Sequence, residues 1–205
     1  SALEATGRVD GTPAFGDYFF VDGTDDYRYL DVSANTVSDW DSAVTAGSLP
    51  TGSGNKGASM AALYRGRVVL SGLETDPQNW FMSASGDPFD FDYSPATTSA
   101  TQAVAGNVSD VGLIGDVVTA LIPFSDDLLF IGGDQTLWLM RGDPAAGGEV
   151  DAVSRGIGVV GPDAWTIDDT GTLYFFGNNG LYRIRAGGGF PELVSQGRLD
   201  RTFSD

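Results

Sequence analysis

The stretch Val117–Gly142, VVTALIPFSDDLLFIGGDQTLWLMRG, contains three apolar runs separated by short polar breaks. The runs are short for helices and are rich in Val, Ile, Leu, Phe and Trp. The breaks, Ser-Asp-Asp and Gly-Gly-Asp, consist of residues that tight turns prefer. Because β-branched and aromatic residues favour pleated strands, the stretch predicts an antiparallel meander of strands joined by hairpins.

The same pattern occurs at three other places in the chain. It recurs at Met60–Gly86 and Ala164–Gly187, and Asp17–Ser33 matches its last two strands. Glycines close the middle strand of each copy at intervals of 49, 60 and 45 residues: Gly23, Gly72, Gly132 and Gly177. A strand-rich unit repeated at such spacing is typical of propeller blades. A β-sandwich with similar hairpins remains the alternative.

We therefore expect an all-β fold, with antiparallel four-stranded blade-like meanders forming a β-propeller or part of one. The predicted domain covers residues 17–195, between an N-terminal arm at 1–16 and a C-terminal tail at 196–205. Its units are expected at about 17–45, 60–95, 117–155 and 163–195. Most propellers have more than four blades, so a segment of a larger propeller fits the pattern as well as a complete four-bladed one.

Two residue types are missing from the composition. The 205-residue chain has no cysteine and no histidine. This excludes disulfides, thiolate metal sites, cysteine nucleophiles and the histidine base of Ser-His-Asp chemistry. We expect no enzymatic activity, no cofactor and no metal. No apolar run approaches the length that a transmembrane helix needs, so no membrane association is expected.

The chain is strongly acidic. Its net charge is −17, from 24 Asp and 4 Glu against 10 Arg and the single lysine, Lys56. Such a surface repels phosphate groups, which argues against a basic groove for nucleic acid.

The most distinctive local sequence is SASGDPFDFDYSP at residues 83–95. Its carboxylates, Asp87, Asp90 and Asp92, have the near-alternate spacing that suits a hard cation such as Ca²⁺. The stretch lacks the glycine and the closing glutamate of an EF-hand loop. We therefore favour a turn followed by an alternating aromatic edge strand, and we expect no metal there.

Four arginines are the candidate interface cations of this acidic chain. Arg183 and Arg185 alternate on one predicted strand, and Arg65 and Arg67 flank a predicted turn. They are expected to pair with aspartates, either within a blade or across a subunit boundary. Asp87, Asp90 and Asp92 belong to the same candidate interface.

The four tryptophans have two interpretations. They could stack on sugar rings, as in a carbohydrate-binding propeller, but in blades they more often fill the space between adjacent sheets. The residues concerned are Trp40, Trp80, Trp138 and Trp165. The four glutamates lie in predicted loops or arms, which gives little support to a catalytic carboxylate pair.

Residues 60–185 resemble the tail nozzle (tail tube B) and DNA-stabilisation proteins of short-tailed bacteriophages. Ala62–Pro95 carries most of the resemblance: an Arg-containing strand, a Pro-containing loop, the strand NWFMS and the segment GDPFDF. Asp126–Phe130, Gln135–Leu139 and Gly180–Arg183 extend it. The chain is short for a complete nozzle protein.

The resemblance implies a structural virion protein of a bacteriophage tail or neck, located in the virion. Such a protein would self-assemble as a homo-oligomer into a ring around the genome exit channel. Its partners would be other tail or neck proteins and passing DNA, bound without sequence specificity. The alternative function is a carbohydrate-binding or glycan-hydrolysing β-propeller of a secreted or surface protein.

Overall fold

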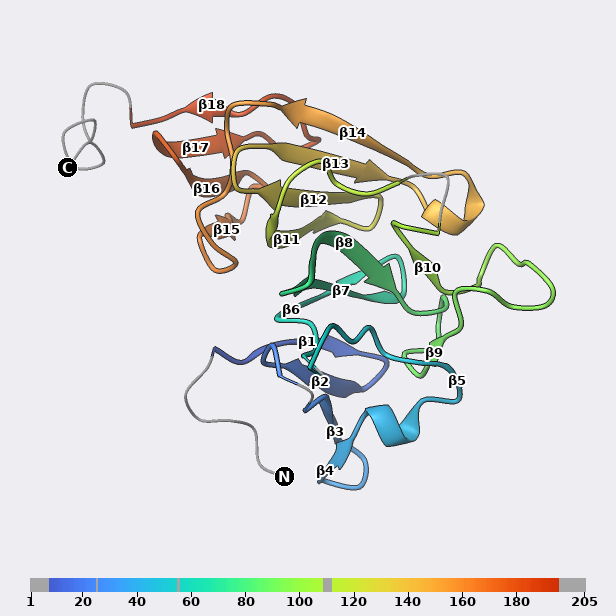
Figure 1. Cartoon of the computed structure of the whole chain (residues 1–205). Helices are drawn as coiled ribbons and strands as arrows, with labels where there is room; N and C mark the ends of the chain where they lie inside the picture. Colours follow the sequence, from blue (N-terminus) through green and yellow to red (C-terminus); the bar gives the residue numbers. More distant parts are fainter. Residues whose placement is uncertain (1–7, 25, 55, 109–111, 196–205) are drawn as a thin grey trace.

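The computed structural model describes residues 8–24, 26–54, 56–108 and 112–195. These residues form four antiparallel sheets of four strands each, in chain order (Figure 1), which confirms the all-β prediction of blade-like meanders. Sheet 1 consists of β1 (Asp10–Ala14), β2 (Asp17–Val21), β3 (Arg28–Asp31) and β4 (Thr36–Asp39). Sheet 2 consists of β6 (Met60–Tyr64), β7 (Arg67–Leu73), β8 (Asp76–Met82) and β10 (Val104–Ala105). Sheet 3 consists of β11 (Val118–Ser125), β12 (Leu128–Gly133), β13 (Leu137–Arg141) and β14 (Glu149–Ser154). Sheet 4 consists of β15 (Trp165–Ile167), β16 (Leu173–Gly177), β17 (Gly180–Ile184) and β18 (Glu192–Leu193).

The four sheets radiate from their first strands. In Figure 1, β1, β6 and β11 lie near the middle, while sheet 1 extends downward to β4 and sheet 3 upward to β14. A small cavity of about 170 Å³ is lined by residues in or next to the first strand of every sheet: Asp10, Gly11, Thr12, Ala61, Ala62, Leu121, Pro123, Pro162, Asp163 and Trp165. The first strands are therefore the inner strands of a radial, blade-like arrangement.

The hydrophobic core of the described residues lies between consecutive sheets, in three clusters. The first joins sheets 1 and 2 through residues such as Phe19 and Leu70. The second joins sheets 2 and 3, as with Met82 and Leu129, and the third joins sheets 3 and 4. Side chains alternate along each strand, so one face of a sheet contacts the preceding sheet and the other contacts the following one. We call these the back and front faces.

The tryptophans fill the space between sheets, as the second of the two interpretations of the sequence predicted. Trp40 and Trp80 are completely buried, in the first and second clusters. Trp138 packs at the margin of the second cluster and Trp165 at that of the third. Their rings are thus part of the core and do not form an exposed sugar platform.

Sheet 1 begins earlier than the sequence indicated. Residues 10–14, expected to be part of an arm, form β1 and pair with β2. Gly11 and Pro13 are unfavourable in strands, so the sequence did not indicate this one. Because β1 is at the edge of its sheet, the missing N–H of Pro13 is tolerated. The remaining part of the arm, residues 1–7, and the predicted tail at 196–205 lie outside the described residues.

The edge strand of sheet 2 also differs from the expectation. Residues 83–95 were expected to supply it, but β10 pairs with β8 instead. The aromatic segment contributes only β9 (Asp90–Phe91), which runs parallel to β5 (Ala46–Gly47). The aspartates of this segment bend the chain into successive turns, so it is not extended for long enough to pair as an edge strand.

The only helices in the described residues are two three-residue 3₁₀ turns, η1 (Asp41–Ala43) and η2 (Pro144–Ala146). Neither approaches the length or the apolar character that crossing a membrane requires.

Candidate functional site

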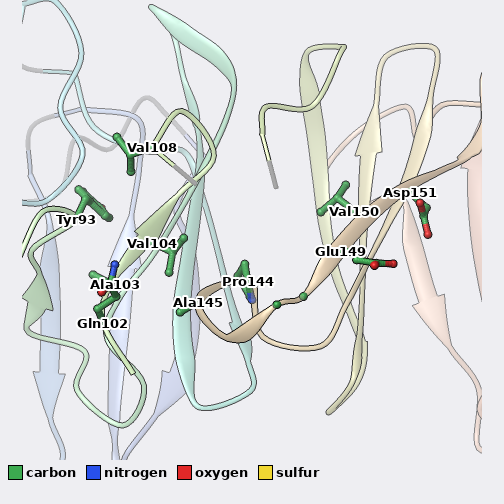
Figure 2. A pocket seen from close by; sticks show the side chains of 12 residues that line it. Tyr93, Gln102, Ala103, Val104, Val108, Pro144, Ala145, Glu149, Val150 and Asp151 are labelled. Carbon is green, nitrogen blue, oxygen red and sulfur yellow. The ribbon is translucent and has the colours of Figure 1, made fainter. Parts of the chain in front are cut away.

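A cleft of about 660 Å³ lies between the outer strands of sheets 2 and 3. Figure 2 shows its two walls: the segment from Tyr93 to Val108 on one side, and η2 with the start of β14 on the other. The residues that line it are Tyr93, Gln102, Ala103, Val104, Val108, Pro144, Ala145, Gly147, Gly148, Glu149, Val150 and Asp151.

Arg67 fixes both walls of the cleft from within. Its side chain is completely buried and forms a salt bridge with Asp143 at 3.0 Å. It also donates hydrogen bonds to the carbonyl oxygens of Ser83 at 2.9 Å, Ala100 at 3.0 Å and Gln102 at 2.6 Å. One guanidinium therefore joins β7, the loop before β10 and the chain just after β13, because its fork of donors can bind several acceptors at once.

Asp143 then shapes the wall on sheet 3. Its Oδ1 accepts a hydrogen bond from the backbone N–H of Ala145 at 2.9 Å, which caps η2. Its carbonyl oxygen accepts one from the N–H of Gly148 at 2.7 Å. Gly147 has φ +84, which L side chains rarely adopt, so the chain turns back tightly here into β14.

One buried polar atom of a residue that lines the cleft has no partner among the described residues. The Tyr93 hydroxyl is screened from solvent and makes no hydrogen bond. Burial raises the pKa of Tyr93 well above its usual value, so the hydroxyl stays protonated. The ring packs against Phe81 and Phe91 of the first cluster, so the hydroxyl belongs to the core and not to the open space of the cleft. Glu149 and Asp151 add two exposed carboxylates on β14, of which Asp151 lies 3.5 Å from Arg141.

The predicted acidic cluster has a structural role in the turns of the chain. Oδ1 of Asp87, Asp90 and Asp92 each accepts a hydrogen bond from the backbone N–H two residues later, at 2.9 to 3.0 Å. These are Asx turns, as the composition of the segment suggested. Among the described residues, no cluster of three or more acidic side chains could hold a metal ion.

The predicted interface arginines all form ion pairs within the chain. Arg65 pairs with Asp127 of the β11–β12 turn, and both Arg183 and Arg185 pair with Glu192, Arg183 at 2.9 Å. Arg67 differs from the expectation of an interface residue, because its guanidinium is completely buried in this structure and cannot reach a second molecule. The other three are at least one-third exposed.

Sequence reasoning did not single out the cleft residues. A signal was present in Asp143-Pro144, since a capping residue followed by Pro is typical of a helical start. Gln102, by contrast, comes from a loop that Arg67 holds, and no local pattern indicated that it would line a cleft with β14.

A second apolar groove, of about 610 Å³, lies on the back face of sheet 1. Tyr18, Phe20 and Leu30 form its floor, and the rings of Tyr18 and Phe20 are 4.8 Å apart. The remaining residues that line it are Pro13, Ala14, Phe15, Gly16, Asp17, Val32 and Leu63.

No protein-family model and no curated protein matches the chain. Among solved structures, the extracellular domain of a hybrid two-component system from Bacteroides thetaiotaomicron has a TM-score of 0.53, at 10% identity, over 90% of this chain and 22% of that one. A structural-genomics protein from the same species has a TM-score of 0.50, at 11% identity, over 94% and 45%. BamB from Moraxella catarrhalis has 0.49, at 15%, over 91% and 48%.

The chain thus spans less than half the length of each of these structures. At such low identity the likeness concerns the fold alone. Together with the four radial sheets, it establishes that this chain has a β-propeller-like fold.

Proposed function

We propose that this chain is a non-enzymatic structural protein that assembles with other protein chains. The contact surfaces would be the faces of its first and last sheets. The observation that carries the proposal is the back face of sheet 1. Each internal contact between sheets covers an apolar face of this kind, whereas no described residue covers the groove on sheet 1.

The residues around this groove are unusually exposed for their type. Val37 is 62%, Val32 58% and Phe15 50% exposed, next to the half-buried Tyr18 and Leu30. Single exposed apolar residues are common, but a contiguous apolar patch on a sheet face marks a surface that another protein covers.

The setting that we propose is the tail or neck of a bacteriophage virion, where copies of the chain would surround the genome exit channel. The resemblance of residues 60–185 to nozzle and DNA-stabilisation proteins supports it. The net charge of −17 is also consistent with this setting, because an acidic channel wall repels DNA phosphates and lets the genome slide without sequence-specific binding.

Phage particles purified from a host that carries the gene provide the test. We expect mass spectrometry of the particles to detect the chain in a fixed ratio to the tail proteins, and immunogold electron microscopy to label the tail or neck. Absence of the chain from particles that contain all other tail proteins would refute the virion setting.

A second candidate function is ligand binding by a propeller of a secreted or surface protein. The cleft between sheets 2 and 3 favours it, because the exposed carboxylates of Glu149 and Asp151 could bind the hydroxyl groups of a carbohydrate. The solved extracellular domain with a similar fold is compatible with such a location.

A glycan array followed by titration calorimetry would test the second candidate. A carbohydrate that binds the wild type should bind the Glu149→Gln variant at least about tenfold more weakly. The Glu74→Gln variant changes an exposed glutamate outside the cleft and should bind normally. No binding on the array, or equal binding by both variants, would eliminate the cleft as a carbohydrate site.

A further inference from the structure

We infer that the chain binds a second copy of itself head to tail, with the front face of sheet 4 of one copy packed on the back face of sheet 1 of the next. The inference rests on the proposed assembly function and specifies its partner.

The direction of the contact follows from the internal packing. In each of the three clusters, the front face of one sheet contacts the back face of the following sheet. Within one copy, an ion pair joins the inner ends of sheets 1 and 4, with Arg8 Nε and Asp163 Oδ2 2.7 Å apart. None of the three clusters, however, contains residues of both of these sheets. Within the part of the chain that the structure describes, the front face of sheet 4 and the back face of sheet 1 are therefore not covered by another sheet.

The two faces have the composition of the internal ones. On the back face of sheet 1, Tyr18 pairs with Leu30 and Leu30 with Val37, which gives a row of apolar side chains across three strands. On sheet 4, Leu181 lies opposite Phe176 and its carbonyl accepts the N–H of Val194. Phe176 and Val194 are 41% and 40% exposed. Each face thus presents an apolar row that extends over three strands.

The charges at the margins differ between the two faces. The front face of sheet 4 carries as many guanidiniums as carboxylates: Arg183 and Arg185 against Glu192 and Asp168. This face is therefore close to neutral, although the chain has a net charge of −17. The groove side of sheet 1 carries three carboxylates, Asp17, Asp26 and Asp39, against the guanidinium of Arg28. Repulsion between like charges therefore disfavours contact of two sheet 1 faces, whereas contact with the nearly neutral face of sheet 4 avoids it.

A second copy is therefore the occupant that the chain itself specifies, because it carries both halves of one asymmetric contact. Such a heterologous contact generates rings or open chains of subunits, depending on whether the rotation closes. It also gives the candidate interface arginines of sheet 4 a role without requiring the buried Arg67.

Sedimentation velocity of the full chain, over a range of concentrations and at low and high salt, tests the inference. We expect reversible self-association that strengthens as salt screens the repulsion between the acidic copies. Val37→Glu on sheet 1 and Phe176→Glu on sheet 4 should each weaken association more than about tenfold. Val160→Glu, at a position 58% exposed and outside both faces, is the matched control and should associate like the wild type.

An equimolar mixture of Val37→Glu and Phe176→Glu makes the test specific. Each variant keeps the face that the other has lost, so the mixture should form a heterodimer through one intact contact. Circular dichroism checks the fold of each variant. Leu30→Glu and Val194→Glu replace any variant that fails to fold.

Three results would overturn the inference. These are a wild type that stays monomeric at all concentrations, association that neither face variant weakens, and a mixture that remains monomeric although the wild type associates. A monomeric wild type found together with the chain in purified particles would overturn the self-contact but leave the virion setting intact. A wild type that self-associates but is absent from purified particles would overturn the virion setting alone.

Discussion

Arg67 shows how one residue can organise two sheets. It is a fully buried cation on β7 whose partners are the Asp143 carboxylate and four backbone carbonyls in or near the cleft. Burial of a charge is unfavourable unless it is paired and hydrogen-bonded, and Arg67 meets both conditions. Its removal would leave Asp143 without its counter-ion.

The variant Arg67→Met tests this role. We expect the free energy of unfolding to fall by about 3–5 kcal/mol, because the partly buried carboxylate and the carbonyls lose their donors. Urea denaturation measures the change. Arg141→Met breaks the exposed pair with Asp151 and should change stability by only about 0–1 kcal/mol. Equal losses in the two variants would contradict the proposed role of Arg67.

Tyr64 predicts a dependence of stability on alkaline pH. Its hydroxyl lies 3.0 Å from the carbonyl oxygen of Asp127 and 2.9 Å from that of Gly142. Burial raises the pKa of Tyr64 to about 12, against about 10 in an unfolded chain. The folded state thus favours the neutral phenol. Its contribution to stability is complete below the unfolded pKa and is lost as pH rises through the folded one.

Urea denaturation between about pH 8 and about pH 12 should therefore show falling stability above about pH 10. The Tyr64→Phe variant should be less stable at neutral pH by about 1 kcal/mol, through loss of a hydrogen bond, and should show a shallower alkaline fall. An identical alkaline slope in wild type and variant would show that Tyr64 does not contribute to it.

At the scale of elements, the recurring glycine of the meander lets a neighbouring buried side chain pack directly on the backbone in sheets 3 and 4. Gly132 lies in β12, and a Cβ at this position would be 2.6 Å from Cγ2 of Val159, a completely buried side chain. Gly177 occupies the same place in sheet 4, where a Cβ would be 2.8 Å from the ring of Tyr182. The glycine is therefore required by sterics at both positions, without any need for an unusual φ.

The variant Gly132→Ala should accordingly be destabilised by about 1–3 kcal/mol, because the core around Val159 must shift to accept a methyl group. Gly161→Ala is the control: its Cβ would contact nothing within 4 Å, and its stability should be unchanged or slightly raised. Thermal and urea denaturation measure both. A Gly132→Ala variant as stable as the control would mean that β12 can move away at no cost.

For the whole molecule, self-repulsion is the dominant electrostatic effect. The 205-residue chain has 28 acidic and 11 basic side chains, so a net charge of −17 would remain even if every cation were paired. Most of those pairs are exposed and individually weak. Compaction brings the excess carboxylates together, so screening by salt should favour the folded state.

The melting temperature should therefore rise when the ionic strength increases from about 0.01 M to about 0.15 M, as the Debye length falls from about 30 Å to about 8 Å. Differential scanning calorimetry in sodium chloride measures the shift. Equal osmolality of an uncharged solute controls for effects other than screening. A melting temperature that falls with salt would mean that the ion pairs outweigh the repulsion.

The features of this protein that depend on neighbouring residues could be predicted from the amino-acid sequence alone. The meanders at Val117–Gly142, Met60–Gly86 and Ala164–Gly187 were readable because strand alternation and turn chemistry are local. The interior position of the tryptophans, and the turn role of Asp87, Asp90 and Asp92, followed for the same reason.

Which distant segments meet depends on packing across the whole fold, and this could not be predicted from local patterns. β10 replaced the expected aromatic strand at the edge of sheet 2, and β1 arose from a stretch with no visible period. Arg67 and Asp143 lie 76 positions apart, and nothing in the local sequence separates this buried arginine from the exposed Arg65. Burial, the cleft and the open back face of sheet 1 all result from long-range packing, which a local pattern does not encode.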